Sequence, residues 1–433
     1  MTARPGALSD LATSGATWSG CHRFAARGVW APRTVEELQD GVGTAGKVRA
    51  LGSRHSLNDV ADTTGALVSV QGLPARFELD DDAATVTVSA GSTYGQVAAG
   101  LGESRWALHN MGSLPHISVA GACATGTHGS GDGNRNLSSA VSAVEVVTAD
   151  GELRRWTRED QADFGGRVLA LGALGVVTAV TLDLVPTFDV RQDVWFDLPW
   201  SVLLDRLDEV MGAAFSVSVM PRWGDPDVAG KVWLKSRTDA WDPGLDPGRL
   251  GARWARAEEG ELAEGQKPNQ TVQGGVPGPW WQRLPHFRPD ASPSRGDEIQ
   301  TEYFVDRLCA ADALRALREV ADRFAHLVLV SELRSVAADD LWLSPTGGRD
   351  ALGIHLTWRN APGEVLEVLP VVERALAPFE PRPHWGKWFT LGAAEVAPSY
   401  PRLEEFRALA EAADPEHRFR NDYLRRVLGL PLG

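Results

Sequence analysis

The chain has 433 residues, of which 43% are hydrophobic and 23% are charged, so it can form two or three globular cores. The net charge is −14 and no segment is dense in Lys or Arg, which excludes nucleic acid and anionic membranes as expected partners and favours a small molecule. Three widely spaced cysteines indicate neither a disulfide framework nor a thiolate metal cluster. The N-terminus lacks a secretory pattern and no run of about 18 apolar residues occurs, so we expect a soluble, cytoplasmic monomer.

The first part of the chain alternates short strand and helix signals. In chain order they predict a strand at 48–53, a strand at 66–72, a hairpin at 77–91 turning at 80–83, a helix at 93–103 capped by Thr93, a hairpin at 143–156 turning at 150–151, and a helix leading into a strand at 163–186. Short strands and helices without one long βαβ array indicate an α+β fold.

A second region begins near Thr187. It is predicted to contain helices at 200–212 and 311–324 and strands at 215–221, 231–237, 298–306, 326–335 and 353–359. Residues 238–298 are rich in Gly, Pro and Asp, which indicates a loop or an excursion that is partly disordered.

Several common site motifs do not apply. "GVGTAGKV" at 41–48 resembles a phosphate-binding loop, but Val48 replaces the hydroxyl that reaches magnesium and a helical segment precedes it. No G-x-G-x-x-G opens a helix after a strand, and no G-x-S-x-G elbow occurs. His109, His116 and His128 lack carboxylate or thiolate neighbours at ligand spacing, so we predict no metal site.

The strongest motif is "NMGSLPHISVAGACATGTHGSGDGNRN" at 110–136, which is made largely of small residues. Glycines and small side chains allow the backbone to approach a ligand and turn N–H groups towards an anion such as a pyrophosphate. A flexible linker is the alternative, but the embedded "HISVAGACAT" is not typical of linkers.

Two predicted strands carry polar faces. In "LVLVSELRS", Val328, Val330, Glu332 and Arg334 share one face by period two, and in "GIHLTWR", His355, Thr357 and Arg359 share one face. If the strands lie side by side, these groups form a polar floor suited to a polyol. Alternatively, they are the solvent faces of edge strands.

"RALGSRHSLND", "GSLPHISVAGACATGTHGSG", "SAVEVVTADGELRRWTR", "LGALGVVTAVTLDLVP", "HWGKWF" and "FRNDYLRRVLG" together resemble the vanillyl-alcohol-oxidase type of flavoprotein, and most closely its alditol oxidase branch. The resemblance covers about residues 18 to 430. It implies a two-domain flavoprotein with a PCMH-type FAD-binding domain at 10–186 and 386–433 and an α+β substrate cap domain at 187–385.

The resemblance also implies site residues. FAD would be attached covalently through His55, whose neutral imidazole is a competent nucleophile, and Arg54 would anchor the loop or a phosphate. The residues expected to line FAD are Ala50, Leu51, Gly52, Ser53, Arg54, His55, Ser56, Ser113, Ser118, Gly121, Thr125, Gly126, Thr127, His128 and Val177. The expected substrate-binding residues are Ser113, Glu332, Arg334, His355, Thr357 and Lys387.

The implied reaction is oxidation of a terminal primary alcohol of an acyclic polyol, such as xylitol or sorbitol, with O₂ reduced to H₂O₂. Arg334 and Lys387 would stabilise alkoxide character, and either His355 or Lys387 would relay the proton. Gly112, beside the expected flavin ring, would leave oxygen access open. The alternatives are a sugar-1,4-lactone oxidase or dehydrogenase of the same family, and a flavin-storing or sensory protein without turnover.

Overall fold

The computed structural model describes residues 13–256, 269–291 and 298–432. Its strands are β1 (Gly28–Trp30), β2 (Val48–Ala50), β3 (Ala66–Val68), β4 (Phe77–Asp80), β5 (Thr85–Ser89), β6 (Trp106–Ala107), β7 (Val141–Val147), β8 (Leu153–Thr157), β9 (Val176–Asp183), β10 (Val185–Pro186), β11 (Asp189–Pro199), β12 (Ser216–Pro221), β13 (Val228–Arg237), β14 (Arg253–Trp254), β15 (Gly278–Pro279), β16 (Glu298–Asp306), β17 (Val328–Val336), β18 (Ala351–Arg359) and β19 (Arg382–Pro383). Its helices are α1 (Val35–Thr44), α2 (Tyr94–Leu101), α3 (Val119–Thr125), α4 (Phe164–Val168), α5 (Trp200–Asp205), α6 (Leu207–Met211), α7 (Ala310–Glu319), α8 (Pro362–Leu376), α9 (Ala393–Val396), α10 (Leu403–Ala413) and α11 (Asp422–Leu428). Within these ranges, no helix combines the length and the apolar character needed to cross a membrane.

Two sheets form the N-terminal part of the fold. A three-stranded sheet has the parallel order β1-β3-β2, and a five-stranded antiparallel sheet has the order β4-β5-β9-β7-β8. Both predicted hairpins are confirmed: β4 and β5 pair, as do β7 and β8, with Gly151 at φ 80° in the second turn. Helix α2 begins at the predicted cap, where Thr93 and Gln96 form a capping box.

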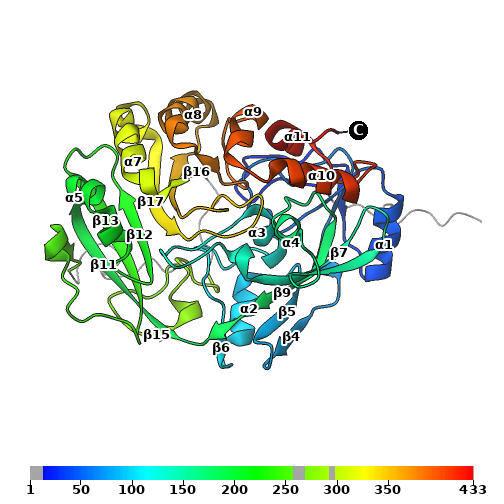
Figure 1. Cartoon of the computed structure of the whole chain (residues 1–433), viewed down its shortest axis with the longest axis horizontal. Helices are drawn as coiled ribbons and strands as arrows, with labels where there is room; N and C mark the ends of the chain where they lie inside the picture. Colours follow the sequence, from blue (N-terminus) through cyan, green and yellow to red (C-terminus); the bar gives the residue numbers. More distant parts are fainter. Residues whose placement is uncertain (1–12, 257–268, 292–297, 433) are drawn as a thin grey trace, which may run out of the picture.

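The C-terminal segment packs against this part of the chain. Val48 N–H donates to the carbonyl of Arg418 (2.9 Å), and the buried Arg49 guanidinium donates to the carbonyl of Phe419 (2.8 Å). Side chains of α10 and α11 join the same hydrophobic core as β5, β7 and β9. Figure 1 accordingly shows α10 and α11, near the C-terminus, beside the N-terminal elements.

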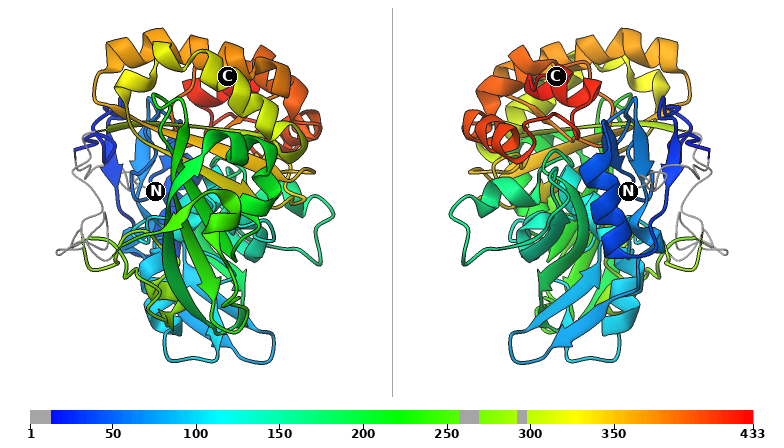
Figure 2. Two further views of the ribbon diagram at one scale, coloured as in Figure 1. Left: turned by 90° about the vertical axis from the view of Figure 1, so that its left-hand side faces the viewer. Right: turned by 90° about the vertical axis from the view of Figure 1, so that its right-hand side faces the viewer.

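A nine-stranded antiparallel sheet carries the cap, with the path β14-β11-β13-β12-β17-β18-β16-β19 and β15 paired to β11. Helices α5, α6, α7 and α8 cover one face, where Leu333, Ile354 and Leu356 are fully buried among their side chains. The opposite face of β16, β17 and β18 is left for polar groups. Figure 2 shows α7 to α11 gathered at one end of the molecule.

Two of the differences from expectation lie in the cap. The helix predicted at 200–212 is divided into α5 and α6 at Arg206, whose φ of −131° lies outside the helical range. The 238–298 excursion contains the short β14 and β15 where it is described, and its remaining residues, 257–268 and 292–297, lie outside the described part of the chain.

Candidate active site

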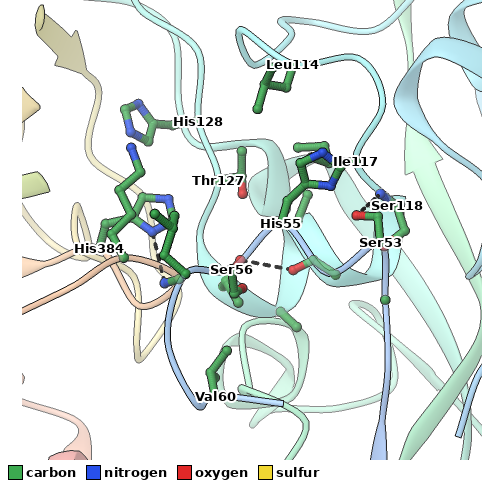
Figure 3. Close-up of a pocket in the computed structure, with 18 of the residues that line it drawn as sticks. Ser53, His55, Ser56, Val60, Leu114, Ile117, Ser118, Thr127, His128 and His384 are labelled. Atoms are coloured by element: carbon green, nitrogen blue, oxygen red, sulfur yellow. Dashed lines mark hydrogen bonds between the residues drawn. The ribbon is translucent and has the colours of Figure 1, made fainter. Parts of the chain in front are cut away.

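A cavity of about 790 Å³ lies between the N-terminal sheets and the polar face of the cap sheet. This volume falls within the range of roughly 300–1,000 Å³ that is usual for small-molecule sites. Loop 50–58, the glycine-rich segment 113–128 and strands β16 to β18 all contribute to its wall. In Figure 3, His55, Ile117 and Ser118 lie on one side of the pocket and His128 and His384 on the other.

The loop after β2 holds Arg54 and His55 in a fixed geometry. Arg54 adopts a left-handed conformation (φ 63°), and its guanidinium donates to the carbonyl of Ser14 at 2.8 Å. Trp18 N–H donates to the Arg54 carbonyl at 2.8 Å, and the Trp18 ring stacks on the His55 ring with centroids 5.2 Å apart. These contacts hold Arg54 within the loop, and because Arg54 also lines the cavity, a role in binding a phosphate stays a prediction.

His55 has the protonation state that a nucleophile needs. Burial lowers the pKa of its imidazole to about 4, so the ring is neutral at pH 7. Its Nδ1 atom is buried without a hydrogen-bond partner in the protein. A neutral ring in the wall of a cavity, with a nitrogen that lacks a hydrogen-bond partner, is suited to bonding a ligand.

Small residues open the cavity wall beside this loop. Ser118 N–H donates to Ser53 Oγ at 3.1 Å, whereas Ser118 Oγ is buried and has no protein partner. A Cβ added at Gly52 or Gly121 would lie 2.8 or 2.7 Å from that Oγ, so the backbone approaches the Ser118 side chain closely at both positions. The volume, the close backbone approach and the unpartnered polar atoms fit a bound FAD.

Gly126 departs from the predicted FAD-lining set. It ends α3 in a left-handed conformation (φ 71°), and a Cβ there would meet Leu169 and Pro345 at 3.1 Å, behind the cavity wall. The cavity-lining residues include every other member of that set: Ala50, Leu51, Gly52, Ser53, Arg54, His55, Ser56, Ser113, Ser118, Gly121, Thr125, Thr127, His128 and Val177.

The predicted polar floor is formed by β17 and β18, which pair side by side with Glu332 opposite His355. Glu332, Arg334, His355 and Thr357 are each at most 8% exposed and line the cavity, so the solvent-face alternative is wrong. The predicted alternation fails only near the start of β17. A bulge there leaves Leu329 and Val330 both about half exposed.

A hydrogen-bonded chain crosses this floor. Lys387 Nζ lies 2.7 Å from His355 Nδ1, and His355 Nε2 lies 2.9 Å from Thr357 Oγ1. Burial and the nearby Lys387 charge lower the pKa of His355 to about 4, so its ring is neutral at pH 7. When Lys387 is charged, it donates to Nδ1, which places the imidazole proton on Nε2.

Glu332 lines the cavity and has one buried oxygen without a hydrogen-bond partner. Burial would raise the pKa of this carboxyl, but the charge of Arg334 and the imidazoles of His286 and His355 outweigh burial and lower the pKa to about 2. Its Oε1 has no hydrogen-bond partner in the protein, and His286 Nε2 lies 3.5 Å from it. Arg334 Nε also has no hydrogen-bond partner and lies 3.8 Å from Glu332 Oε2, while Arg334 NH1 donates to Ser113 Oγ at 3.4 Å. The floor therefore offers a buried acceptor and a buried donor to a ligand.

Glu302 on β16 is a site residue that the sequence analysis missed. Its side chain is fully buried, accepting at Oε1 from Arg334 NH2 (2.8 Å) and at Oε2 from Lys387 Nζ (2.6 Å). Burial would raise the pKa of Glu302, but Arg334 and Lys387 hold it well below its usual range. Glu298, Gln300 and Glu302 alternate along the predicted strand 298–306, and this period-two pattern indicates that the three polar side chains share one face.

One cluster has donor atoms at metal-ligand spacing. Ligand atoms of His128, Glu302 and His384 lie within 4.8 Å of one another. The charges of Arg334 and Lys387, both bonded to Glu302, oppose a further cation at that point. The absence of a metal site stays a prediction.

The sheets and the cavity between them define a two-domain α+β flavoprotein with a PCMH-type FAD-binding domain. A family model described as "FAD binding domain" matches residues 26–157, and one described as "D-arabinono-1,4-lactone oxidase" matches residues 294–427. The fold is similar to that of cholesterol oxidase from Brevibacterium sterolicum, with a TM-score of 0.77 at 16% identity, covering 100% of this chain and 99% of the other.

Two relatives cover nearly the whole chain. Alditol oxidase from a Streptomyces species is 44% identical over 96% of this chain and 100% of its own length. L-gulono-1,4-lactone dehydrogenase from Mycobacterium tuberculosis is 30% identical over 95% of this chain and 98% of its own length. The chain belongs to the vanillyl-alcohol-oxidase type of FAD-linked oxidoreductases, in the branch that contains alditol oxidase.

Proposed function

We propose that the protein oxidises a terminal primary alcohol of an acyclic polyol, such as xylitol or sorbitol, to the aldose, and reduces O₂ to H₂O₂. The observation that carries the proposal is the pair of unpartnered atoms on β17, Glu332 Oε1 and Arg334 Nε. A hydroxyl group can donate to the first and accept from the second, since it has both capacities. An open chain of hydroxyls satisfies such a floor more fully than an apolar alcohol.

FAD, when bound, supplies the acceptor for the hydride that leaves the substrate carbon. The protein's part is to hold the reacting alcohol and move its proton. Arg334 and Lys387 stabilise alkoxide character at the hydroxyl, and His355 and Thr357 extend the hydrogen-bonded chain from Lys387. Either His355 or Lys387 receives the proton.

We also propose covalent attachment of FAD through His55. Its low pKa, its unpartnered Nδ1 and its place in the cavity wall support a nucleophilic role. The stacked Trp18 ring restrains the imidazole, which favours a single orientation for bond formation.

We propose an FAD-binding domain made of residues 10–186 and 386–433, and a substrate cap domain made of residues 187–385. The packing of α10 and α11 on the core of the N-terminal sheets supports the first assignment. In the described part of the chain no disulfide joins Cys21, Cys123 or Cys309, which supports a reducing, cytoplasmic location.

An aldonolactone is the second candidate substrate, because the family model for D-arabinono-1,4-lactone oxidase matches residues 294–427, which include the polar floor. The ring of a lactone presents fewer hydroxyls than an open polyol. The lactone carbonyl cannot donate to Glu332 Oε1, so only the remaining hydroxyls of a lactone can do so.

Two measurements test the proposal. Purified protein is denatured in acid to learn whether the yellow colour stays with the polypeptide, and peroxide release is then assayed with xylitol, sorbitol and L-gulono-1,4-lactone. His55→Ala should release the colour, while His116→Ala, a nearby histidine that also has an unpartnered Nδ1, should retain it. Covalent flavin in His55→Ala would refute the attachment site, and peroxide release from the lactone alone would refute the substrate.

A further inference from the structure

Glu302 joins four ionisable groups from four different segments of the chain. Arg334 comes from β17, His355 from β18 and Lys387 from the segment after β19, while His128 comes from the glycine-rich loop. Besides the two cation bonds, His128 Nε2 lies 3.2 Å from Oε1 and His355 Nδ1 lies 3.7 Å from Oε2. Both carboxylate oxygens are thus occupied by protein groups, so Glu302 can act on a substrate only through them.

The local sequence makes room for this carboxylate. Glu302 pairs with His355 across β16 and β18, and the neighbouring Gly353 lies beside Arg334 on β17. A Cβ added at Gly353 would lie 3.2 Å from Glu302 Oε1, tighter than an ordinary contact. The backbone N–H of His384 donates to the Glu302 carbonyl at 2.9 Å, which ties the segment that bears Lys387 to the same residue.

The geometry leaves the two cations directed at the cavity. A lysine ammonium has three N–H donors, of which Lys387 uses one on Glu302 and, when charged, one on His355. The third is available to an oxygen in the cavity that Lys387 lines. Glu302 holds Arg334 at NH2, while NH1 reaches Ser113. Arg334 Nε has no hydrogen-bond partner and lies 3.8 Å from Glu332 Oε2.

We propose that Glu302 is a positioning residue for the alcohol oxidation: it fixes the Arg334 guanidinium and the Lys387 ammonium in the orientation that serves the reacting hydroxyl. This inference rests on the proposed function. Without the carboxylate, two cations in a buried site would repel each other and lose their common acceptor. Both would then turn away, and the hydroxyl would lose the groups that stabilise its developing charge.

The charge on Lys387 provides a test that does not depend on turnover. Burial lowers the pKa of Lys387, Glu302 and Glu332 oppose that effect, and Arg334 adds to it. The imidazoles of His128, His355 and His384 also face the cluster, and burial lowers the pKa of each. Removing an opposite charge in contact with a group typically shifts its pKa by about 1–3 units.

The experiment is an NMR titration of protein labelled with ¹³C at lysine Cε. The chain contains only five lysines, and Lys387→Met identifies the Lys387 signal by its loss. In Glu302→Gln we expect the pKa of Lys387 to fall by about 1–3 units. We also expect kcat for xylitol to fall roughly 10²–10³-fold, with a smaller change in KM.

Glu373→Gln is the matched control. Glu373 is also a buried carboxylate, but it bonds Tyr303 Oη (2.8 Å) and Thr390 N–H (2.7 Å) on the helix side of the sheet. It should change neither the pKa of Lys387 nor the rate constants. If Glu302→Gln does not fold, Glu302→Asp replaces it. The aspartate side chain is one methylene shorter, so the pKa of Lys387 and kcat for xylitol should both fall by smaller amounts.

The possible outcomes separate the two proposals. An unchanged pKa of Lys387 together with an unchanged kcat, in either Glu302 variant, would overturn the positioning role. Wild-type protein that oxidises no polyol would instead overturn the proposed function, and the NMR titration would still decide whether Glu302 controls Lys387.

Discussion

Replacing Glu332 with glutamine removes the charge from the floor while keeping the size of the side chain. Glu332 Oε1 is buried without a hydrogen-bond partner, 3.5 Å from His286 Nε2, so it can accept from a substrate hydroxyl. A hydrogen bond to a charged group contributes about 1.5–3 kcal/mol, which corresponds to roughly a 10- to 100-fold loss in kcat/KM. The amide of Glu332→Gln also loses acceptor capacity, so the loss should lie towards the upper end of that range for xylitol.

The assay is peroxide release measured over a range of xylitol concentrations, with Glu373→Gln as the control for substituting a buried carboxylate. Short diols extend the test, because a substrate with fewer hydroxyls makes fewer contacts with the floor and should lose less on substitution. A kcat/KM for xylitol within about twofold of the wild type would refute the role given to Glu332, since that is well below the expected loss.

Two further predictions concern oxygen and acid. A Cβ at Gly112 would lie 3.4 Å from Thr127 Cγ2, an ordinary contact, so Gly112→Ala should fold. The variant should react more slowly with O₂ but be bleached by xylitol under anaerobic conditions at the wild-type rate. A reaction with O₂ as fast as that of the wild type would contradict this prediction. Burial lowers the pKa of His286 to about 3 and that of His355 to about 4, whereas an unfolded histidine titrates near 6.5. The unfolded chain therefore binds more protons between pH 6.5 and 4, and each residue should cost about 3 kcal/mol of stability by pH 4. Tm should fall steadily on acidification from pH 7, and a flat Tm down to pH 4.5 would contradict the burial of these rings.

The features that the sequence predicted well have local causes. The hairpin at Gly151 and the capping box at Thr93 depend on residues within a few positions of one another, and the polar floor follows from strand periodicity. The sequence did not predict the division of the helix at Arg206. At that point the Arg206 guanidinium donates to Glu209 and to the Arg249 carbonyl. That last contact is distant in sequence.

Glu302 was missed for a related reason. Its partners His128 and Lys387 lie 174 and 85 positions away, and no local pattern brings them together. The floor strands could be predicted to carry polar faces, but the carboxylate that balances their charge comes from the neighbouring strand β16. Only the pairing of β16 with β18 places it there.

The most direct test of the proposed activity is anaerobic mixing of the purified protein with xylitol while flavin absorbance is followed. We predict that the yellow colour bleaches with xylitol and sorbitol, faster than with L-gulono-1,4-lactone, and returns when O₂ is admitted with release of H₂O₂. Bleaching by the lactone but by neither polyol would contradict the assignment of the substrate, and a flavin that no polyol or lactone bleaches would contradict the proposed reaction.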